Sequence, residues 1–440
     1  MSATTLALVA ALALAAAPAA AGLAPAERKM VAAVDAATPR GLELLQRAVD
    51  VNSGTMNFAG VREVARLFQP ELERLGFTAR WVDGAAWGRA GHLIAERPGR
   101  GGGPRVLLIG HLDTVFEADS PFQRWEKLSD TEARGPGAID MKGGVVVLLL
   151  ALEGLARAGA LDRLALTVVL TGDEEKPGAP IELARADLIA AADRADLAIG
   201  FEDGAGDPRT AVIARRGSAS WVLKTSGRPA HSSQIFKPEV GDGAIYEQAR
   251  ILNAFRDSLR AEPWLTFSPG VTVGGTKVSF DREQSRGTAF GKTNVVAEST
   301  YLAGDLRAVS PEQRERAVAT MQRIVARNLP GTGAAIEFGE SYPPLAPSDG
   351  NRRLLALFDR ASRDLDFGPV EGVDPSRAGA ADVSFAAGRV EGAIDGLGLM
   401  GRGGHTVGET ADLTTLPMQA KRVAVLLSRL VKEWGSRPGS

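Results

Sequence analysis

The chain has 440 residues, of which 45% are hydrophobic and 24% charged; this composition is ordinary for a soluble protein and excludes wholesale disorder. At about 150 residues per domain, the length predicts two or three domains, and the net charge of −2 gives no field that would attract nucleic acid or an anionic membrane. The chain has no cysteine, which excludes disulfides, thiol nucleophiles and iron–sulfur clusters, so histidines and carboxylates must hold any metal.

The first 21 residues predict a signal for export. Residues 4–21 are small and apolar, and no charged residue occurs before Glu27. The run ends in Ala19-Ala20-Ala21, an A-x-A-like cleavage site before Gly22. Because the run begins without Lys or Arg, an uncleaved membrane anchor is the alternative. We expect an exported protein, periplasmic or secreted, that has no membrane contact once the signal is removed.

The segment after the signal predicts an α/β domain. Apolar residues at helical spacing indicate helices, and short apolar runs bounded by Gly or Asp indicate buried parallel strands. Helices are predicted at 25–50, 61–75, 145–156 and 181–192, and strands at 106–109, 164–170 and 197–201. This alternation is typical of a sheet with helices on both faces, whose functional site lies at the carboxyl ends of the strands.

The pattern changes near Thr210. Strands with more polar residues are predicted at 221–224, 271–280, 294–306 and 334–338, with helices at 240–259 and 311–328. That order indicates a small βαββαβ-like module inserted into the larger domain. From Asn351 the α/β pattern returns, and it closes with an amphipathic helix at 417–434. We therefore predict a signal peptide (1–21), a catalytic domain in two parts (22–210 and 343–440) and a satellite domain (211–342).

The residues with the most informative chemistry follow the predicted strands. His111 and Asp113 lie just beyond the strand at 106–109. A histidine that binds a metal commonly donates its second N–H to a carboxylate, and Asp113 has the right spacing to accept it. Taken alone, this H-x-D pattern is equally typical of a turn with a capping Asp.

Four more acids and a second histidine occur in similar places. Asp140 lies in a Gly-rich segment before a helix, Glu174 and Glu175 follow the strand at 164–170, Glu202 follows the strand at 197–201, and His405 lies in a Gly-rich turn. Individually these acids fit helix caps or solvated loops. Because adjacent side chains point apart, one of the two neighbouring glutamates can bind a metal while the other faces the reacting water. Together, two histidines and three carboxylates match a two-metal hydrolytic site with N and O ligands.

Competing motifs fail on their context. Gly396–Gly401 fits G-x-G-x-x-G, but a Gly-rich loop follows it instead of a helix, which argues against a dinucleotide site. The segment Gly287–Thr293 is one residue too short for a P-loop. His92, at the start of a probable strand, is interpreted as structural.

The set of motifs resembles the dizinc exopeptidase and amidohydrolase family of glutamate carboxypeptidase, aminoacylase, acetylornithine deacetylase and succinyl-diaminopimelate desuccinylase, and is most similar to glutamate carboxypeptidase. The motifs are G-H-x-D, G-P-G-x-x-D-x-K-G-G, D-E-E, F-E, S-G-x-x-x-H and a late G-x-H, and they span essentially the whole mature chain. The resemblance implies a mixed-sheet α/β catalytic domain with helices on both faces and an inserted α+β satellite domain for dimerisation. It also implies two Zn²⁺ ions, with Co²⁺ or Mn²⁺ as alternatives, and a homodimer.

The resemblance also implies a role for each matching residue of the catalytic domain. Asp140 would bridge the two metals. The other metal ligands would be His111 and Glu202 at one site, and Glu175 and His405 at the other. Glu174 would be the general base, and Asp113 would orient His111.

Three residues of the satellite domain match the family in the same way. His231, in S-G-x-x-x-H, resembles the histidine that reaches the neighbouring subunit's site and stabilises the oxyanion; without the resemblance it would be interpreted as a surface-loop residue. Asn294 and Arg307 resemble residues that hold the substrate's carboxylate, for which the bidentate guanidinium is suited.

These assignments predict a dizinc hydrolase that cleaves the amide bond of a peptide or N-acyl amino acid. Glutamate at position 202, where aminopeptidases of the family have aspartate, favours acyl–amino-acid substrates, and we expect a carboxypeptidase that releases a C-terminal residue such as glutamate. An N-acyl-amino-acid deacylase or a dipeptidase is the alternative. A non-catalytic binding protein is opposed by the occupation of all six key positions.

Overall fold

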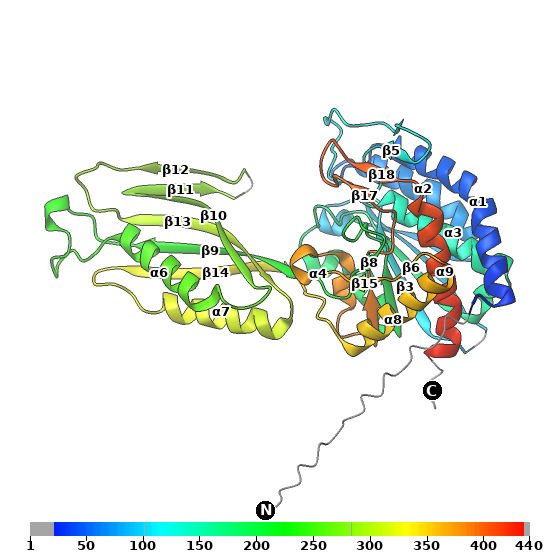
Figure 1. Cartoon of the computed structure of the whole chain (residues 1–440). Coiled ribbons are helices and arrows are strands. Elements are labelled where there is room, and N and C mark those ends of the chain that lie inside the picture. The colour runs from blue at the N-terminus through cyan, green and yellow to red at the C-terminus, as the bar shows by residue number, and fades with distance from the viewer. Residues whose placement is uncertain (1–21, 101, 283, 435–440) are drawn as a thin grey trace, which may run out of the picture.

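The computed structural model describes residues 22–100, 102–282 and 284–434, so the predicted signal peptide at 1–21 lies outside the described residues. The described chain forms a larger α/β domain and a satellite domain that extends from one side of it (Figure 1). In the part of the chain that is described, no helix has the length and apolar character needed to cross a bilayer.

A six-stranded mixed sheet forms the centre of the larger domain. Its strand order is β1-β2-β6-β3-β7-β16, and only β2 runs against the direction of the other five. The strands are β1 (Thr78–Asp83), β2 (Gly91–Arg97), β3 (Arg105–His111), β6 (Ala165–Thr171), β7 (Leu197–Gly200) and β16 (Gly392–Ile394). The three apolar runs of the sequence became β3, β6 and β7, which are parallel and lie side by side, so their carboxyl ends meet at one edge.

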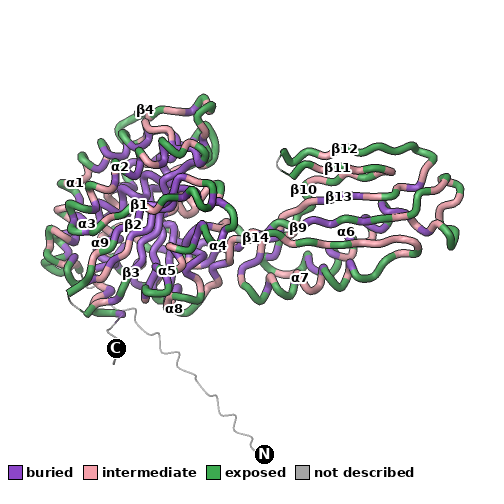
Figure 2. The backbone as a smooth tube through the Cα atoms, turned by 180° about the vertical axis from the view of Figure 1, so that it is seen from behind, coloured by how far each residue is buried: buried purple, intermediate pink, exposed green. Residues whose placement is uncertain are grey.

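Helices cover both faces of this sheet, as the α/β pattern predicts. Five pack around one large apolar core: α1 (Pro25–Val49), α2 (Phe58–Arg74), α3 (Lys142–Arg157), α8 (Asp349–Asp364) and α9 (Thr415–Glu433). The opposite face is covered by α4 (Ile181–Ala184), α5 (Ala186–Asp193) and the 3₁₀ turn η5 (Asp382–Ala386). Figure 2 shows the buried sheet between these layers.

The single helix predicted at 181–192 is divided in the structure. The break falls at Arg185, whose guanidinium is fully buried and donates hydrogen bonds to Asp173 and Asp382, at 2.7 Å in each case. Asp173 follows β6 and Asp382 begins η5, so the arginine side chain points inward at this break, and the next helix begins at Ala186.

Two small sheets lie outside the central one. One has the order β17-β18-β5-β4 and joins segments about 270 residues apart, because Thr410 of β18 pairs with Arg134 of β5. Its strands are β4 (Glu126–Lys127), β5 (Glu132–Arg134), β17 (Gly401–Arg402) and β18 (Thr410–Asp412). The other pairs β8 (Thr210–Ala211) with β15 (Glu371–Gly372). Short 3₁₀ turns complete the domain at η1 (Ala85–Trp87), η2 (Leu161–Arg163) and η4 (Pro375–Arg377).

The satellite domain is a four-stranded antiparallel sheet with two helices on one face. Its strand order is β10-β13-β9-β14, and Trp221, Phe255 and Met321 are among the residues of its apolar core. Its elements are β9 (Gly217–Ser226), η3 (Ser232–Gln234), α6 (Ala244–Leu259), β10 (Thr266–Gly275), β11 (Lys277–Asp281), β12 (Arg286–Phe290), β13 (Ser299–Ala308), α7 (Pro311–Val325) and β14 (Gly333–Tyr342). This is the predicted βαββαβ order with one hairpin, β11-β12, added between β10 and β13.

The satellite differs from the sequence prediction in three details. The predicted strand at 271–280 is divided between β10 and β11, and the polar segment after it forms the second strand of the hairpin. Helix α6 begins at Ala244 instead of Val240, because Gly241 and Gly243 adopt the positive φ angles of +82° and +78° that a helix excludes. Residues 210–216 still pair with the larger domain, so the satellite sheet begins at Gly217.

Candidate functional site

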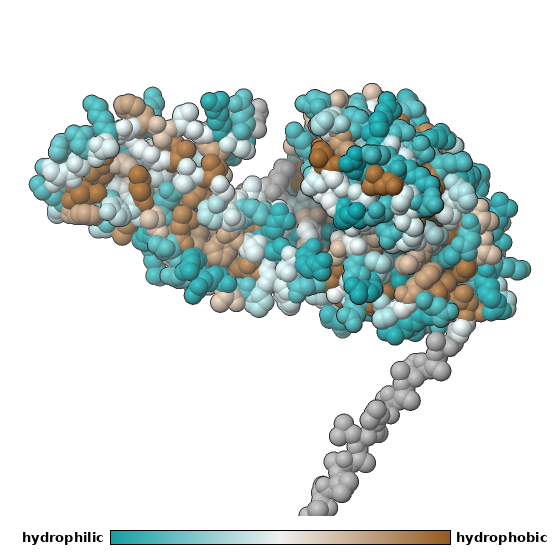
Figure 3. All heavy atoms as spheres, turned by 45° about the horizontal axis from the view of Figure 1, so that its top comes forward, coloured by the Kyte–Doolittle hydropathy of each residue, from teal (hydrophilic) through white to brown (hydrophobic). Residues whose placement is uncertain are grey.

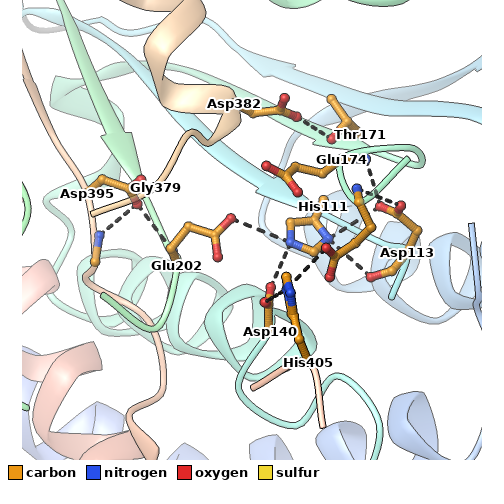
Figure 4. A network of polar contacts seen from close by, with 12 residues as sticks. His111, Asp113, Asp140, Thr171, Glu174, Glu202, Gly379, Asp382, Asp395 and His405 are labelled. Atoms are coloured by element: carbon orange, nitrogen blue, oxygen red, sulfur yellow. Dashed lines mark hydrogen bonds and ion pairs between the residues drawn. The ribbon is translucent and has the colours of Figure 1, made fainter. Parts of the chain in front are cut away.

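The carboxyl ends of the parallel strands bring four predicted residues together. His111 is the last residue of β3, Glu174 and Glu175 follow β6, and Glu202 follows β7. Because these three strands are neighbours, the side chains meet above one edge of the sheet (Figure 4).

Two loops add the remaining predicted ligands. Asp140 lies in the loop between β5 and α3, and His405 lies in the turn between β17 and β18, where its φ angle is +61°. The pairing of β18 with β5 holds these two loops side by side. Figure 4 shows the side chains of Asp140 and His405 in contact below His111.

The five residues form two groups that share Asp140. His111, Asp140 and Glu202 form one group, and Asp140, Glu175 and His405 form the other; within each group, one ligand atom per residue lies within 4.8 Å of the others. Nε2 of His111 lies 3.0 Å from Oδ1 of Asp140 and 3.5 Å from Glu202. Nε2 of His405 lies 2.8 Å from Oδ2 of Asp140 and 3.2 Å from Glu175. Each oxygen of Asp140 therefore faces a different histidine.

Asp113 connects three parts of this site. Its Oδ1 lies 3.3 Å from Nδ1 of His111 and accepts a hydrogen bond from the backbone N–H of Glu174 at 3.0 Å. Its Oδ2 accepts hydrogen bonds from the Thr55 hydroxyl at 2.6 Å and from the N–H of Glu175 at 3.1 Å. Nδ1 of His111 also lies 3.1 Å from the backbone carbonyl oxygen of Asp113, so both the backbone and the carboxylate of Asp113 orient the imidazole. The buried carboxylate also holds the loop that carries both glutamates.

The carboxylate of Glu174 points into the site without a partner. Its side-chain oxygens form no hydrogen bond or ion pair with any described residue. Glu174 lines a cavity of about 350 Å³ together with Asp140, Glu202 and His405. Burial raises the pKa of the Glu174 carboxyl well above its ordinary value, and the negative charges of Asp382 and Glu202 add to this shift. Such a carboxyl has the position and the basicity expected of a proton acceptor.

The donor set fits divalent cations. Oε1 of Glu175 is buried and has no hydrogen-bond partner among the described residues, as expected for an oxygen that binds a metal. Burial, and after it the negative charge of Asp140, raise the pKa of Glu202 to about 7. Hydrogen bonding of its Nε2 to the carboxylates of Asp140 and Glu175 raises the pKa of His405 to about 11. Nitrogen and oxygen donors, arranged as two groups around one shared carboxylate, suit a pair of divalent metal ions.

The structure separates the three predicted residues of the satellite. Arg307, near the end of β13, lies beside Gly379, which lines the cavity, and its Nε is paired with Asp305 at 2.8 Å. His231 and Asn294 lie together at the other end, where Asn294 accepts a hydrogen bond from Ser232. The ten residues of β9 separate that end of the satellite from the larger domain. At roughly 3.3 Å per residue, the two ends of this strand are about 30 Å apart. Within one chain, His231 and Asn294 do not reach the cavity.

Sequence reasoning missed several buried residues that support the site. Asp395 accepts hydrogen bonds from the N–H of Glu202 at 3.3 Å and from Arg215 at 2.8 Å, and Glu409 accepts three from the loop that carries Asp140. Lys142 is fully buried and donates to the carbonyl of Val51 at 3.0 Å. Burial of these acids depends on contacts between distant segments, which composition does not reveal.

His92 has the structural role predicted for it. The ring is buried, stacks on Trp87 with a centroid distance of 5.1 Å, and lies 2.8 Å from the carbonyl oxygen of Ala184. Its other nitrogen accepts a hydrogen bond from Gly172 at 3.2 Å.

Comparison with known proteins extends these observations. The model of peptidase family M20/M25/M40 matches residues 107–429. Carboxypeptidase G2 of Pseudomonas sp. strain RS-16 is 26% identical over 427 residues, which cover 94% of this chain and 95% of the relative. Succinyl-diaminopimelate desuccinylase of Acidiphilium cryptum is 26% identical over 377 residues, covering 82% and 91% of the two chains. The crystal structure of aminopeptidase PepT from Bacillus cereus matches with a TM-score of 0.70 at 20% identity, over 90% of this chain and 99% of that one, which confirms the fold.

Proposed function

The chain belongs to peptidase family M20/M25/M40 and is a metal-dependent hydrolase, and on that premise we propose that it is a carboxypeptidase that cleaves the amide bond before a C-terminal amino acid such as glutamate. The observation that carries the proposal is the unpaired carboxylate of Glu174 beside two potential metal groups that share Asp140. Arg307 supports the choice of a substrate with a free carboxylate, because its guanidinium lies beside Gly379, a residue that lines the cavity. An N-acyl-amino-acid deacylase or a dipeptidase is the second candidate.

The metal ligands in this proposal are those predicted from the sequence. Asp140 would contact both ions, His111 and Glu202 would complete one site, and Glu175 and His405 the other. The ions are Zn²⁺ in the proposal, with Co²⁺ and Mn²⁺ as alternatives. The chemistry that bound ions supply is a lower pKa for the attacking water and polarisation of the scissile carbonyl.

The side chains of the chain then perform the proton transfers. Glu174 takes a proton from the attacking water and delivers it to the leaving nitrogen. Asp113 keeps His111 in the tautomer whose Nε2 is free to bind a metal, because its backbone carbonyl accepts a hydrogen bond from Nδ1 at 3.1 Å and its carboxylate lies 3.3 Å from the same nitrogen. His231 of a second subunit would donate a hydrogen bond to the oxyanion, a contribution of roughly 3 kcal/mol for such donors.

A homodimer is part of the proposal because one chain cannot bring His231 to its own cavity. The end of the satellite that carries His231 also has exposed apolar side chains, including Ile245, Tyr246 and Phe290, around a groove of about 660 Å³. Figure 3 shows apolar side chains on the satellite and the hollow between it and the larger domain. A second copy that covers this end would place its own His231 and Asn294 near the hollow.

The test of the base uses Glu174→Ala, with Glu182→Ala on the exposed face of α4 as the matched control. We expect Glu174→Ala to lose turnover while binding as much metal as the wild type, and the control to retain both. Turnover by Glu174→Ala at normal metal content would contradict the assignment. The substrate is identified with a panel of folyl-glutamate conjugates, N-acyl amino acids and dipeptides. Preference for N-acyl amino acids without a peptide bond would favour the deacylase instead.

The shared site is tested by mixing two inactive variants. His231→Ala and Glu174→Ala should each be nearly inactive, while a mixture allowed to exchange subunits should regain part of the activity, because some dimers then contain one intact site. No recovery in a mixture shown to form mixed dimers would contradict the shared site. Export, to the periplasm or the medium, is proposed from the sequence of residues 1–21 and is tested by fractionating cells that express the full chain.

A further inference from the structure

Glu409 is a fully buried acid that belongs to neither metal group. It follows the turn of His405 and immediately precedes β18. Its Oε1 accepts hydrogen bonds from the backbone N–H groups of Ile139 at 2.9 Å and Asp140 at 3.3 Å, and its Oε2 accepts one from Gly137 at 3.2 Å. One carboxylate therefore holds three backbone groups of the loop that ends at the shared acid.

The same residue is also fixed to the turn that carries His405. The N–H of Glu409 donates a hydrogen bond to the carbonyl of Thr406 at 3.0 Å. The N–H of Thr406 in turn donates to the carbonyl of Gly403 at 3.1 Å. In addition, the carbonyl of Glu409 accepts a hydrogen bond from Gly135 at 3.3 Å. Glu409 is thus hydrogen-bonded both to the turn that carries His405 and to the loop that carries Asp140. The 2.8 Å distance between Nε2 of His405 and Oδ2 of Asp140 depends on both sets of hydrogen bonds.

Lys142 and the close packing of Gly137 form part of the surroundings of Glu409. Lys142 is fully buried; burial lowers its pKa to about 7, although the negative charges of Glu409, Asp50 and Asp113 act in the opposite direction. Gly137 has a φ angle of +75°, and a Cβ atom there would lie 2.7 Å from the side chain of Thr114. A residue with a side chain would therefore not fit at this close approach between the loop and Thr114.

We propose that Glu409 is a positioning residue of the metal centre: its carboxylate sets the backbone of Asp140, and so the shared carboxylate, relative to His405. The residue touches neither substrate nor reacting atoms and acts through the loop that it holds. This inference rests on the metal site of the proposed function and names a further residue on which that site depends.

The test compares Glu409→Asp and Glu409→Gln with Glu132→Gln. Aspartate is one methylene shorter and cannot reach all three N–H groups, whereas the oxygen of glutamine can replace Oε1 and retain two of them. Glu132 is the matched control, because it is a surface carboxylate on β5 of the same small sheet, paired with Arg402 at 2.7 Å. Each metal-free protein is titrated with Co²⁺ by calorimetry and by visible absorption, and its thermal unfolding is measured in chelator.

We expect Glu409→Asp to bind one of the two Co²⁺ equivalents about 10–100-fold more weakly, the range typical for residues that support metal ligands, with an altered absorption spectrum. Glu409→Gln should lose about tenfold, and Glu132→Gln should match the wild type. The proposal would be overturned if Glu409→Asp binds both Co²⁺ equivalents with the wild-type affinity and spectrum and shows only a lower unfolding temperature. Glu409 would then have a structural role alone.

If Glu409→Asp does not fold, Glu409→Gln decides: an affinity within twofold of the wild type for both equivalents overturns the proposal, and a loss of about tenfold supports it. The wild-type titration separates this result from the proposed function. If the wild type binds no metal, the proposed function itself is contradicted. If it binds two equivalents, the metal affinities of the variants decide the role of Glu409.

Discussion

Replacement of Asp113 by asparagine would change one oxygen of a carboxylate that accepts hydrogen bonds from three donors. In the wild type, Oδ1 accepts a hydrogen bond from the N–H of Glu174, and Oδ2 accepts hydrogen bonds from the N–H of Glu175 and the Thr55 hydroxyl. Asparagine places an NH₂ group at one of these positions, where it faces a backbone N–H. Whichever way the amide turns, one of the two backbone donors loses its acceptor.

The preferred orientation of the new amide follows from the partners. With nitrogen at the Oδ2 position, Thr55 can rotate and accept, and only the N–H of Glu175 is left unpaired. With nitrogen at the Oδ1 position, the N–H of Glu174 is left unpaired and the new NH₂ group faces Nδ1 of His111, which is hydrogen-bonded to the backbone carbonyl of Asp113 in the wild type. The first arrangement costs less and keeps the tautomer of His111. We therefore expect the free energy of unfolding to fall by about 1–3 kcal/mol, the cost of one unsatisfied buried donor, and metal affinity to fall by roughly 10–100-fold.

Urea unfolding of the metal-free protein measures the first effect, and calorimetric titration with Zn²⁺ measures the second. Asp119→Asn, an exposed position in the loop that follows Asp113, is the control and should match the wild type in both. If Asp113→Asn unfolds at the wild-type urea concentration and binds Zn²⁺ with unchanged affinity, Asp113 does not hold the glutamate loop or orient His111, and this account of the site is refuted.

Two further predictions concern stability away from the ligands. In the same urea assay, Arg185→Met should lower the free energy of unfolding by about 3–5 kcal/mol, because the buried carboxylates of Asp173 and Asp382 lose their cation. The control is Arg194→Met, which removes an exposed ion pair with Glu96 and should lower the free energy of unfolding by less than about 1 kcal/mol. Burial raises the pKa of Glu27, but hydrogen bonds from Arg429 and the Ala24 N–H outweigh it and leave the pKa below its ordinary value; Glu27→Gln should therefore cost about 1–2 kcal/mol at pH 7. That difference should shrink as the pH falls through the lowered pKa, since protonation then removes the wild-type advantage, and an equal difference at pH 7 and pH 3.5 would contradict the assignment.

The residues at strand ends were the predictable part of the site. His111, Glu175 and Glu202 follow short apolar runs, and parallel strands necessarily place their carboxyl ends at one edge. The spacing of these residues along the chain therefore carried geometric information. The edge strand β1 was less visible, because its residues are exposed or half-buried and give no continuous apolar run.

The loop residues were harder to predict because long-range pairing places them. The loop of Asp140 and the turn of His405 meet only because β5 pairs with β18, and no local pattern encodes that register. Glu409 is a clear case: an acid in a Gly-rich turn is typical of a solvated surface, yet here three backbone N–H groups surround it. Recognition of its role required the positions of those donors, which belong to a segment about 270 residues earlier.

The crowding of acids at the site links metal binding to the stability of the fold. Asp140, Glu175 and Glu202 meet with only two histidines, and the nearby guanidinium of Arg215 is already bound to Asp395. Without cations these carboxylates repel one another, so bound metal should stabilise the folded chain, by about 4 kcal/mol at a free concentration a thousandfold above Kd. We expect the thermal midpoint to fall by several degrees in chelator and to recover with Zn²⁺. Glu174→Ala should show the same recovery because Glu174 is in neither group, whereas His405→Ala should show less. Equal midpoints with chelator and with Zn²⁺ would mean that the acids are accommodated without cations, and the two-metal assignment of Asp140 would then fail.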